Sequence, residues 1–240
     1  MGHRILVVDD EPHIRTLLRA YLEAEGHLVT EAASGADALH RALATDGSAP
    51  DLVLLDVGLP DLDGLEVLRI LRRSCDVFVI LVTARAEEVD TLIGLSAGAD
   101  DYVTKPFSPR EVVARVRTVL RRAGRATQAA DAQDQVLRFH GLTLDEQRRE
   151  LTVDGAPVVL SSLEFDLLRA LASSPGRVFS RTQLLEEAWG YDFYGDPRVV
   201  DVHIRSIRNA LGDDASAPRI IGTVRGVGYK FLPTPAEVGS

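Results

Sequence analysis

The chain has 240 residues, of which 45% are hydrophobic and 26% are charged, and its formal net charge is −9 at pH 7. This length allows two ordinary domains, each with its own core. No apolar run approaches the roughly 20 residues that a membrane span requires, and the run at Ile5 is too short for a signal peptide, so we expect a cytoplasmic protein without membrane partners. Because Cys75 is the only cysteine, an intramolecular disulfide or a cysteine zinc cluster is excluded.

The first half of the chain alternates short apolar runs with amphipathic segments. We expect strands at the apolar runs Ile5–Val8, Leu28–Thr30, Leu52–Leu55, Val77–Val82 and Tyr102–Val103. We expect helices at the amphipathic segments Ile14–Glu25, Gly35–Ala44, Leu65–Arg73, Ala86–Ala97 and Pro109–Arg122. This alternation predicts an α/β flavodoxin-like (βα)5 domain at residues 1–122, with a parallel sheet of order 2-1-3-4-5 covered on both faces.

The pattern changes after residue 122. Residues 123–135 are small and polar, which predicts a flexible linker. Short alternating stretches follow at Arg138–Leu144 and Glu150–Val153, with a hairpin signal at Asp154-Gly155. Helices are expected at Ser162–Ser173, Arg181–Trp189 and Arg198–Leu211, and a closing hairpin at Ile220–Val224 and Tyr229–Leu232. This order predicts an α+β domain at residues 136–232 and a tail at residues 233–240.

Polar side chains gather at the ends of the predicted parallel strands. Asp9 and Asp10 end the first strand, Asp56 ends the third, Thr83 ends the fourth, and Lys105 follows the fifth. Because the first and third strands are neighbours in the expected order, the three carboxylates should converge at one edge of the sheet. Clustered carboxylates repel one another unless a cation neutralises them, and oxygen ligands favour Mg²⁺ or Mn²⁺. With the metal bound, one carboxylate can attack a phosphoryl donor to give an aspartyl phosphate.

Single motifs at this edge allow other interpretations. The segment 9–12 could be only a helix start, with Pro12 in the first turn. Asp61-Leu-Asp63-Gly64 hints at a calcium loop but lacks the remaining ligand spacing, so a loop and helix cap is favoured. An aspartate-nucleophile phosphohydrolase is a rival enzyme, but it needs a second Asp two residues after the nucleophile, where this chain has Gly58.

Four segments in register resemble receiver domains of two-component systems: Ile-Leu-Val-Val-Asp9-Asp10-Glu11, Leu-Leu-Asp56-Val-Gly-Leu-Pro60, Val-Thr83-Ala-Arg85 and Gly-Ala-Asp-Asp-Tyr-Val-Thr-Lys105-Pro-Phe107. The resemblance implies Asp56 as phosphoacceptor and Lys105 as the partner of the phosphoryl group. It implies as metal ligands Asp10, Asp56 and the Gly58 carbonyl, with Asp9 behind them or acting through water. It also implies a switch formed by Thr83 and Tyr102, and a cis Lys105-Pro106 peptide.

The helix expected at Arg198–Leu211 has two faces. An apolar side carries Val200, Ile204, Ile207 and Leu211, and the opposite side carries Arg198, Val202, Arg205, Ser206 and Asn209. Arg and Asn can make bidentate contacts to base edges. Although the chain is acidic overall, residues 198–230 are locally basic, so nucleic-acid binding is not excluded. Taken alone, the helix would more often present an ordinary solvated face, and His203 at its edge could equally be a packed residue.

Residues 137–232 resemble the winged-helix effector domain of the OmpR/PhoB family. The resemblance rests on Leu160-Ser-Ser-Leu-Glu-Phe-Asp-Leu-Leu168, Ser180-Arg-Thr-Gln-Leu184, Val200-Asp-Val-His-Ile-Arg-Ser-Ile-Arg208 and Thr223-Val-Arg-Gly-Val-Gly-Tyr229. The DNA-binding residues that it implies are Arg198, Val202, His203, Arg205, Ser206 and Arg208 on or beside the recognition helix, and Thr223, Arg225 and Tyr229 in the wing. Arg225 is expected in the minor groove, and the loop from Trp189 to Pro197 lies where the family often meets RNA polymerase.

The same resemblance implies a phosphorylation-controlled dimer. The charged residues expected on the dimer face of the receiver are Asp100, Asp101, Glu111, Arg115 and Arg122. Our hypothesis is that a sensor histidine kinase phosphorylates Asp56, that two receivers then form a homodimer, and that the linked effector domains bind tandem half-sites in promoter double-stranded DNA. Such a protein is not an enzyme beyond its own phosphotransfer and slow autodephosphorylation. The alternative is a constitutive DNA-binding regulator with a silent receiver.

Overall fold

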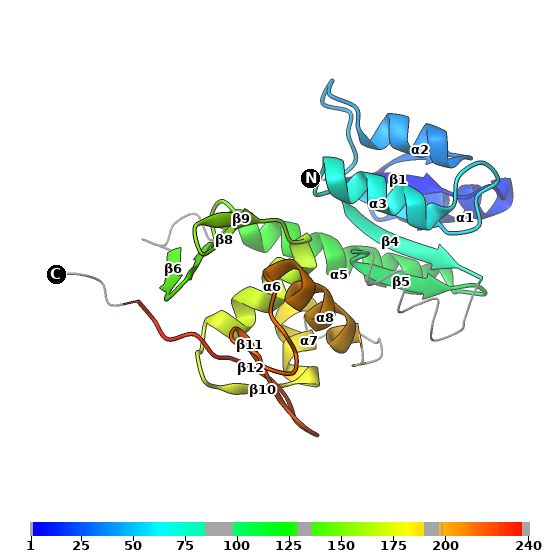
Figure 1. Ribbon diagram of the computed structural model, residues 1–240. Coiled ribbons are helices and arrows are strands. Elements are labelled where there is room, and N and C mark those ends of the chain that lie inside the picture. The colour runs from blue at the N-terminus through cyan, green and yellow to red at the C-terminus, as the bar shows by residue number, and fades with distance from the viewer. Residues whose placement is uncertain (1, 85–97, 129–135, 190–196, 198, 237–240) are drawn as a thin grey trace. The chain divides into compact units, whose positions relative to one another are not determined.

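The computed structural model divides into two compact units, Met1–Arg121 and Arg122–Ser240 (Figure 1). The structure describes residues 2–84, 98–128, 136–189, 197 and 199–236, with the side chains of all of these except 122–128 and 189. Among the described helices, none is long and apolar enough to cross a membrane.

The first unit is built on one parallel sheet. Its strands are β1 (Arg4–Val8), β2 (Leu28–Ala32), β3 (Leu52–Asp56), β4 (Phe78–Thr83) and β5 (Asp101–Thr104), and their order is β2-β1-β3-β4-β5. Its described helices are α1 (Pro12–Ala24), α2 (Gly35–Ala42), α3 (Gly64–Ser74) and α5 (Pro109–Gln128). The predicted parallel sheet and its strand order are therefore confirmed, while the helix predicted at residues 86–97 lies outside the described residues.

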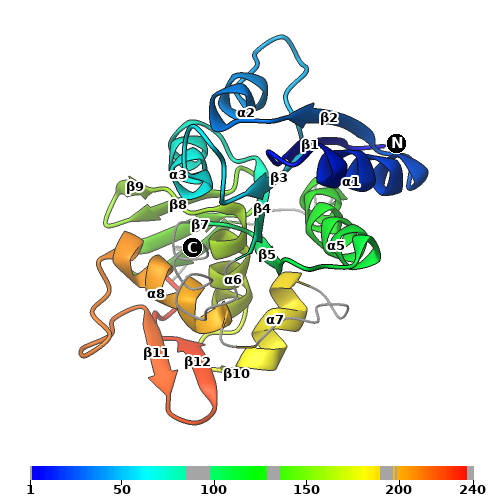
Figure 2. The ribbon, with the colours of Figure 1, turned by 90° about the vertical axis from the view of Figure 1, so that its right-hand side faces the viewer.

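Helices cover both faces of this sheet, as the uninterrupted apolar strands require. Helices α1 and α5 lie on one face, and α2 and α3 lie on the other (Figure 2). The apolar stripe of α5 is completely or almost completely buried, from Val112 at 0% exposure to Val113 at 7%. Because β3 is buried along its whole length and β1 is buried from Ile5 onward, the residues at their carboxyl ends are held by a rigid core.

The second unit combines two antiparallel sheets with three helices. The first sheet contains β6 (Val136–Phe139), β7 (Leu142–Asp145), β8 (Glu150–Val153) and β9 (Ala156–Val158). The helices are α6 (Ser162–Ala172), α7 (Arg181–Trp189) and α8 (Val199–Leu211), and the second sheet has β10 (Val178–Ser180), β12 (Gly228–Phe231) and β11 (Ile221–Val224) in that order. The predicted antiparallel sheet, helices and closing hairpin are confirmed. The hairpin signal is also confirmed, since Asp154 and Gly155 both have positive φ between β8 and β9.

Three local details differ from the sequence-based expectations. The stretch 138–144 is two strands, because the chain turns at Gly141 with φ +75°. Helix α5 continues to Gln128, into the segment predicted as a linker, where Ala, Arg and Gln favour a helix. The first part of the predicted tail pairs with the outer edge of β6, since the Ala236 N–H donates to the Arg138 carbonyl at 2.9 Å.

Candidate functional site

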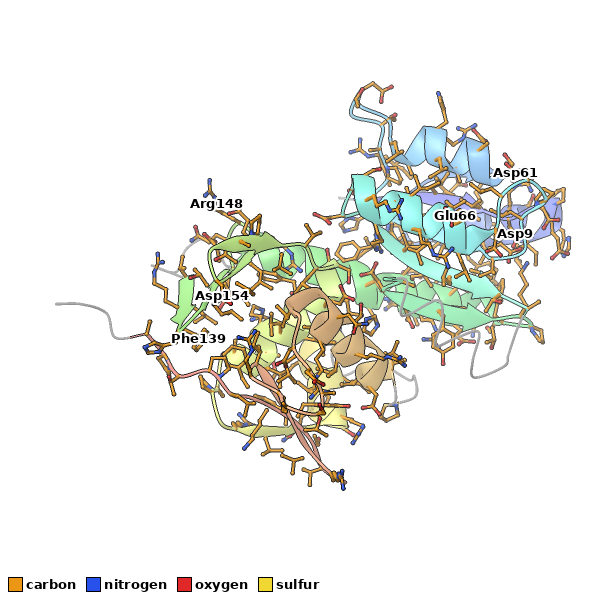
Figure 3. The ribbon with its side chains drawn as sticks, in the orientation of Figure 1. Asp9, Asp61, Glu66, Phe139, Arg148 and Asp154 are labelled. Carbon is orange, nitrogen blue, oxygen red and sulfur yellow. The ribbon has the colours of Figure 1, made fainter. Side chains whose placement is uncertain are left out.

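The carboxyl ends of β1 and β3 bring three carboxylates together. One oxygen each from Asp9, Asp10 and Asp56 lies within 4.8 Å of the others. Asp9 is 1% exposed and Asp56 is 5% exposed, whereas Asp10 faces solvent. Figure 3 shows Asp9 at the same end of the sheet as Asp61. The predicted convergence is thus observed, and the spacing of these oxygens fits a shared divalent cation.

Lys105 closes this cluster from the end of β5. Its Nζ lies 2.9 Å from Asp9 Oδ2, 3.1 Å from Asp56 Oδ2 and 3.2 Å from Glu11 Oε1. The Lys105-Pro106 peptide that follows it is cis, as predicted. The contact with Glu11 was not predicted, although Glu11 stands next to the two aspartates in the sequence. One lysine faces the three clustered aspartates and this glutamate, which leaves an excess of negative charge for a metal ion to neutralise.

Burial and charge act in opposite directions on these groups. Burial raises the pKa of Asp9, and the hydrogen bond from Lys105 partly opposes that shift. For Lys105, burial alone would lower the pKa, but its contacts with Asp9 and Asp56 outweigh burial and raise it above the usual value. Lys105 therefore remains a cation at any physiological pH and can hold an anionic group.

The loop that follows Asp56 is fixed at both ends. The Gly58 N–H donates to Asp56 Oδ1 at 3.3 Å. Asp61 accepts hydrogen bonds at the start of α2 from the N–H groups of Gly35 (2.8 Å) and Ala36 (3.0 Å), and these bonds lower its pKa. Asp63 caps α3 by accepting from the Leu65 N–H at 2.8 Å. The helix-cap interpretation of this segment is therefore confirmed.

Gly64 places the start of α3 directly behind the phosphoacceptor candidate. A Cβ at this position would lie 2.2 Å from the Asp56 carbonyl oxygen and 2.8 Å from the Val57 Cα. Both atoms belong to the backbone, so a side chain at residue 64 cannot be accommodated without moving the end of β3. Sequence reasoning missed this role, because the glycine was interpreted only as part of a loop.

The predicted switch residues lie on β4, which is next to β3, and on β5 at the edge of the sheet. Thr83 is the last residue of β4, is buried, and pairs in register with Thr104 of β5. Tyr102 lies in β5 and is half-buried, and its N–H donates to Asp101 Oδ1 at 2.8 Å. Both residues thus lie on the β4–β5 side of Asp56 in the sheet.

The charged residues predicted for the dimer face form ion pairs within the chain. Arg115 contacts Asp101 at 3.1 Å and Glu111 at 3.0 Å. Asp100 pairs with Arg72 at 2.7 Å and also accepts the Val79 N–H at 2.8 Å. Arg72, which sequence reasoning missed, further donates to the carbonyls of Gly98 and Val77. The side chain of Arg122 lies outside the described residues.

In the second unit, helix α8 buries the predicted apolar side. Exposure is 0% for Val200, 1% for Ile204, 0% for Ile207 and 5% for Leu211. On the opposite side Arg205 is exposed and Ser206 is half-buried. Val202 and His203 are buried as well, at 7% and 0%, so the buried surface of α8 is wider than the helical wheel predicted. Arg198 lies outside the described residues.

The predicted wing residues divide into two groups. Arg225 is exposed in the turn between β11 and β12, next to Gly226 at φ +75°. Arg208, by contrast, donates from Nη2 to the Ile221 carbonyl at 2.7 Å and to Thr223 Oγ1 at 2.8 Å. Tyr229 is 6% exposed, and its hydroxyl donates to Asp201 at 2.7 Å. Arg225 and Thr223 are therefore exposed in the wing, whereas Tyr229 is buried.

Comparisons with known proteins agree with these two units. Two family models match, described as response regulator receiver domain at residues 5–117 and as transcriptional regulatory protein, C terminal, at residues 155–231. The chain is 44% identical to transcriptional regulatory protein ResD of Bacillus subtilis, over 99% of this chain and 97% of ResD. It is 45% identical to transcriptional regulatory protein TrcR of Mycobacterium tuberculosis, over 96% of this chain and 87% of TrcR.

Two solved structures of full regulators match along nearly the whole chain. Response regulator DrrB, an OmpR/PhoB homologue from Thermotoga maritima, is 36% identical with a TM-score of 0.51, over 97% of this chain and 100% of DrrB. A mutant of RitR is 29% identical with a TM-score of 0.80, over 96% and 99% of the two chains. Neither the phosphohydrolase nor the silent receiver is favoured by these matches. The chain therefore belongs to the OmpR/PhoB family of response regulators, which are phosphorylation-controlled transcription factors and not enzymes.

Proposed function

We propose that Asp56 is the phosphoacceptor of this regulator. The observation that carries the proposal is the position of its carboxylate, which is buried, lies 3.1 Å from Lys105 Nζ and shares one cluster with Asp9 and Asp10. In the transfer, an Asp56 oxygen attacks the phosphorus of a phosphohistidine on the sensor histidine kinase, the P–N bond breaks, and the imidazole leaves. Lys105 then holds an oxygen of the new phosphoryl group.

The residues proposed to hold a divalent ion are Asp10, Asp56 and the Gly58 carbonyl, with Asp9 behind them. When bound, Mg²⁺ or Mn²⁺ supplies positive charge that screens the phosphoryl group as it approaches the carboxylates. Asp61 and Asp63 bond the starts of α2 and α3 and so hold the loop that contains Gly58 in place beside Asp56. Slow autodephosphorylation at the same site, with water as the attacking group, limits the lifetime of the signal.

Phosphorylation is proposed to act through the β4–β5 side of the receiver. Thr83 moves to bond the phosphoryl oxygens, and Tyr102 turns inward behind it. The ion pairs of β5 and α5, such as Arg115 with Asp101, lie where two receivers would meet. Exchange of these partners between two copies gives a symmetric interface and a homodimer. Because the Asp101 side chain is 1% exposed, its pair with Arg115 has to be exchanged rather than broken when the two copies meet.

The second unit is proposed to read promoter DNA with α8 and the wing. Arg205 and Ser206 face the major groove, and Arg225 enters the minor groove. Two linked units on tandem half-sites raise each other's effective concentration, so weak binding at a single site suffices. The loop from Trp189 to Pro197, proposed to contact RNA polymerase, lies almost entirely outside the described residues.

The test compares the parent chain with Asp56→Ala and with the control Asp37→Ala, whose carboxylate pairs with Arg41 on the surface of α2. Each protein is treated with acetyl phosphate and Mg²⁺, and its mass, oligomeric state and affinity for selected DNA are measured. We expect the parent and Asp37→Ala to gain one phosphoryl group, dimerise and bind DNA more tightly, and Asp56→Ala to do none of these.

An Asp56→Ala protein that responds like the parent would contradict the proposal. A parent that is phosphorylated without any change in dimerisation would favour the silent receiver, and steady release of phosphate would favour a hydrolase.

A further inference from the structure

The recognition helix α8 is joined to the wing at two points, and neither point uses Arg205 or Arg225. The first point is Asp201 in the first turn of α8. Its Oδ1 accepts hydrogen bonds from the Tyr229 hydroxyl of β12 and from Arg181 Nε at the start of α7, each at 2.7 Å. Three elements thus meet at one carboxylate oxygen.

The second point is Arg208, near the end of α8. Its Nη2 bonds the Ile221 carbonyl and the Thr223 hydroxyl of β11, and its Nε lies 4.0 Å from Asp213. Asp213 in turn accepts the N–H groups of Arg219, Ile220 and Ile221 at 2.6 to 3.1 Å, which fixes the start of the same strand. The Arg208 side chain is 11% exposed, so most of its surface is already in contact with protein.

These two points lie on the same side of the helix. Seven residues separate them, which at 100° per residue is about two full turns and about 10 Å along the axis. Figure 2 shows the β11–β12 hairpin beside α8, which is where both points attach. Two contacts at this separation fix the direction of the hairpin as well as its distance from the helix. The pairing of β12 with β10 holds the base of the hairpin, so the two contacts act on how the hairpin lies against α8.

The chemistry of the first point also fits a positioning role. A carboxylate on a recognition helix repels phosphate, but Arg181 pairs with Asp201 and neutralises it. The Arg181 and Arg208 guanidinium groups lie 5.5 and 5.8 Å from the centre of the Tyr229 ring, within the range of cation–π attraction. Burial, together with Asp201, raises the pKa of Tyr229 to about 12, so the hydroxyl stays a hydrogen-bond donor at neutral pH.

We propose that Arg181, Asp201, Arg208 and Tyr229 form a helix–wing clamp, whose members are positioning residues rather than readers of DNA. The clamp holds Arg225 at a fixed place relative to Arg205, so that both arginines can enter their grooves without a further loss of conformational freedom. The inference rests on the proposed DNA-reading function and says which residues set the position of Arg225 relative to Arg205. Arg208 and Tyr229, which the family resemblance implies as DNA-binding residues, act on DNA through the position of the wing.

The test is a double-mutant cycle in the phosphorylated full-length chain, with a fluorescent duplex that the parent itself selects from random-sequence DNA. In the parent, Arg225→Ala should weaken binding about tenfold, as expected for the loss of one good groove contact. In a Tyr229→Phe or Arg208→Lys background the clamp is broken at one of its two points. Arg225→Ala should then weaken DNA binding less than about twofold. Arg148→Lys, the same substitution at a residue exposed between β7 and β8, should leave the tenfold cost unchanged.

A second measurement is independent of DNA. Amide hydrogen exchange in residues 224–228 of the free protein should accelerate in Tyr229→Phe and Arg208→Lys and stay at the parent rate in Arg148→Lys. The clamp would be overturned if Arg225→Ala weakened DNA binding about tenfold in both clamp variants, as in the parent, or if hydrogen exchange at the wing did not change. If Tyr229→Phe does not fold, Asp201→Ala removes the acceptor at the same point and replaces it in the cycle. A parent that selects no DNA would instead overturn the proposed function, and the exchange measurement would still decide the clamp.

Discussion

The acidic pocket of the receiver and the recognition surface of the second unit use polar side chains in different ways. In the pocket, Asp9, Asp56 and Lys105 lie at the ends of three strands, and both carboxylates are within hydrogen-bond distance of Lys105. On the recognition surface, Arg205 and Arg225 point away from the protein, while Arg208 is engaged by it. A site that binds one small group is made by side chains that converge on one point, whereas a DNA-reading surface needs some residues to contact the DNA and others to hold those residues in place.

Removal of the divalent ion should have the largest effect, and it should affect only one of the two sites. With EDTA, incorporation of phosphate from acetyl phosphate should fall by at least about a hundredfold, because three carboxylates then face the incoming phosphoryl group without the charge of the ion. Intact mass after timed reaction measures this loss, and added Mg²⁺ should restore the reaction. Binding of the unphosphorylated chain to DNA should not change. Undiminished phosphorylation in EDTA would refute the proposed metal site.

The ion pair between Arg72 and Asp100 should matter most for the stability of the receiver. Its partners are 14% and 1% exposed at the side chain, so Arg72→Ala removes a cation that lies 2.7 Å from a buried carboxylate. Breaking such a pair costs about 3–5 kcal/mol. Hydrogen exchange of β4 and β5 amides in increasing urea measures the loss. Arg69→Ala removes the exposed pair with Glu66 from the same helix and should cost about 0–1 kcal/mol, so equal losses would contradict the assignment.

Gly64 tests how tightly Asp56 depends on the backbone behind it. Gly64→Ala places a methyl group 2.2 Å from the Asp56 carbonyl oxygen, and we expect a loss of about 2–3 kcal/mol together with slower phosphorylation. Gly58→Ala is the matched control in the same loop, because its Cβ meets no atom within 4 Å and its carbonyl is kept. Urea unfolding and the rate with acetyl phosphate separate the two variants. Similar behaviour of both would show that the close approach is relieved without moving Asp56.

The sequence was sufficient where position along an element decides the structure. The ends of predicted strands located Asp9, Asp10, Asp56 and Lys105, because parallel strands place their carboxyl ends at one edge whatever the loops do. Apolar spacing likewise predicted the buried side of α8.

The sequence was insufficient where distant segments meet. Arg72 and Asp100 are 28 residues apart, and Asp201 and Tyr229 are also 28 residues apart, so no local pattern pairs them. A helical wheel gave the direction of Val202 and His203 but not the neighbours that bury them. Strand β10 was missed because three residues carry too little periodicity to identify a strand, and it forms only by pairing with β12.

Arg205 provides a smaller effect that separates reading from general attraction to DNA. It is the exposed arginine in the middle of α8, so Arg205→Ala should weaken binding to the selected duplex about tenfold, which corresponds to about 1.4 kcal/mol. On a duplex of unrelated sequence the loss should be much smaller, because there the residue contributes only charge. Fluorescence anisotropy with both duplexes at one salt concentration gives the ratio. Arg148→Ala removes a charge of the same kind from an exposed turn and should change neither affinity. Equal losses on both duplexes would mean that Arg205 contacts phosphate, and the reading of bases would then have to be assigned to other residues of α8.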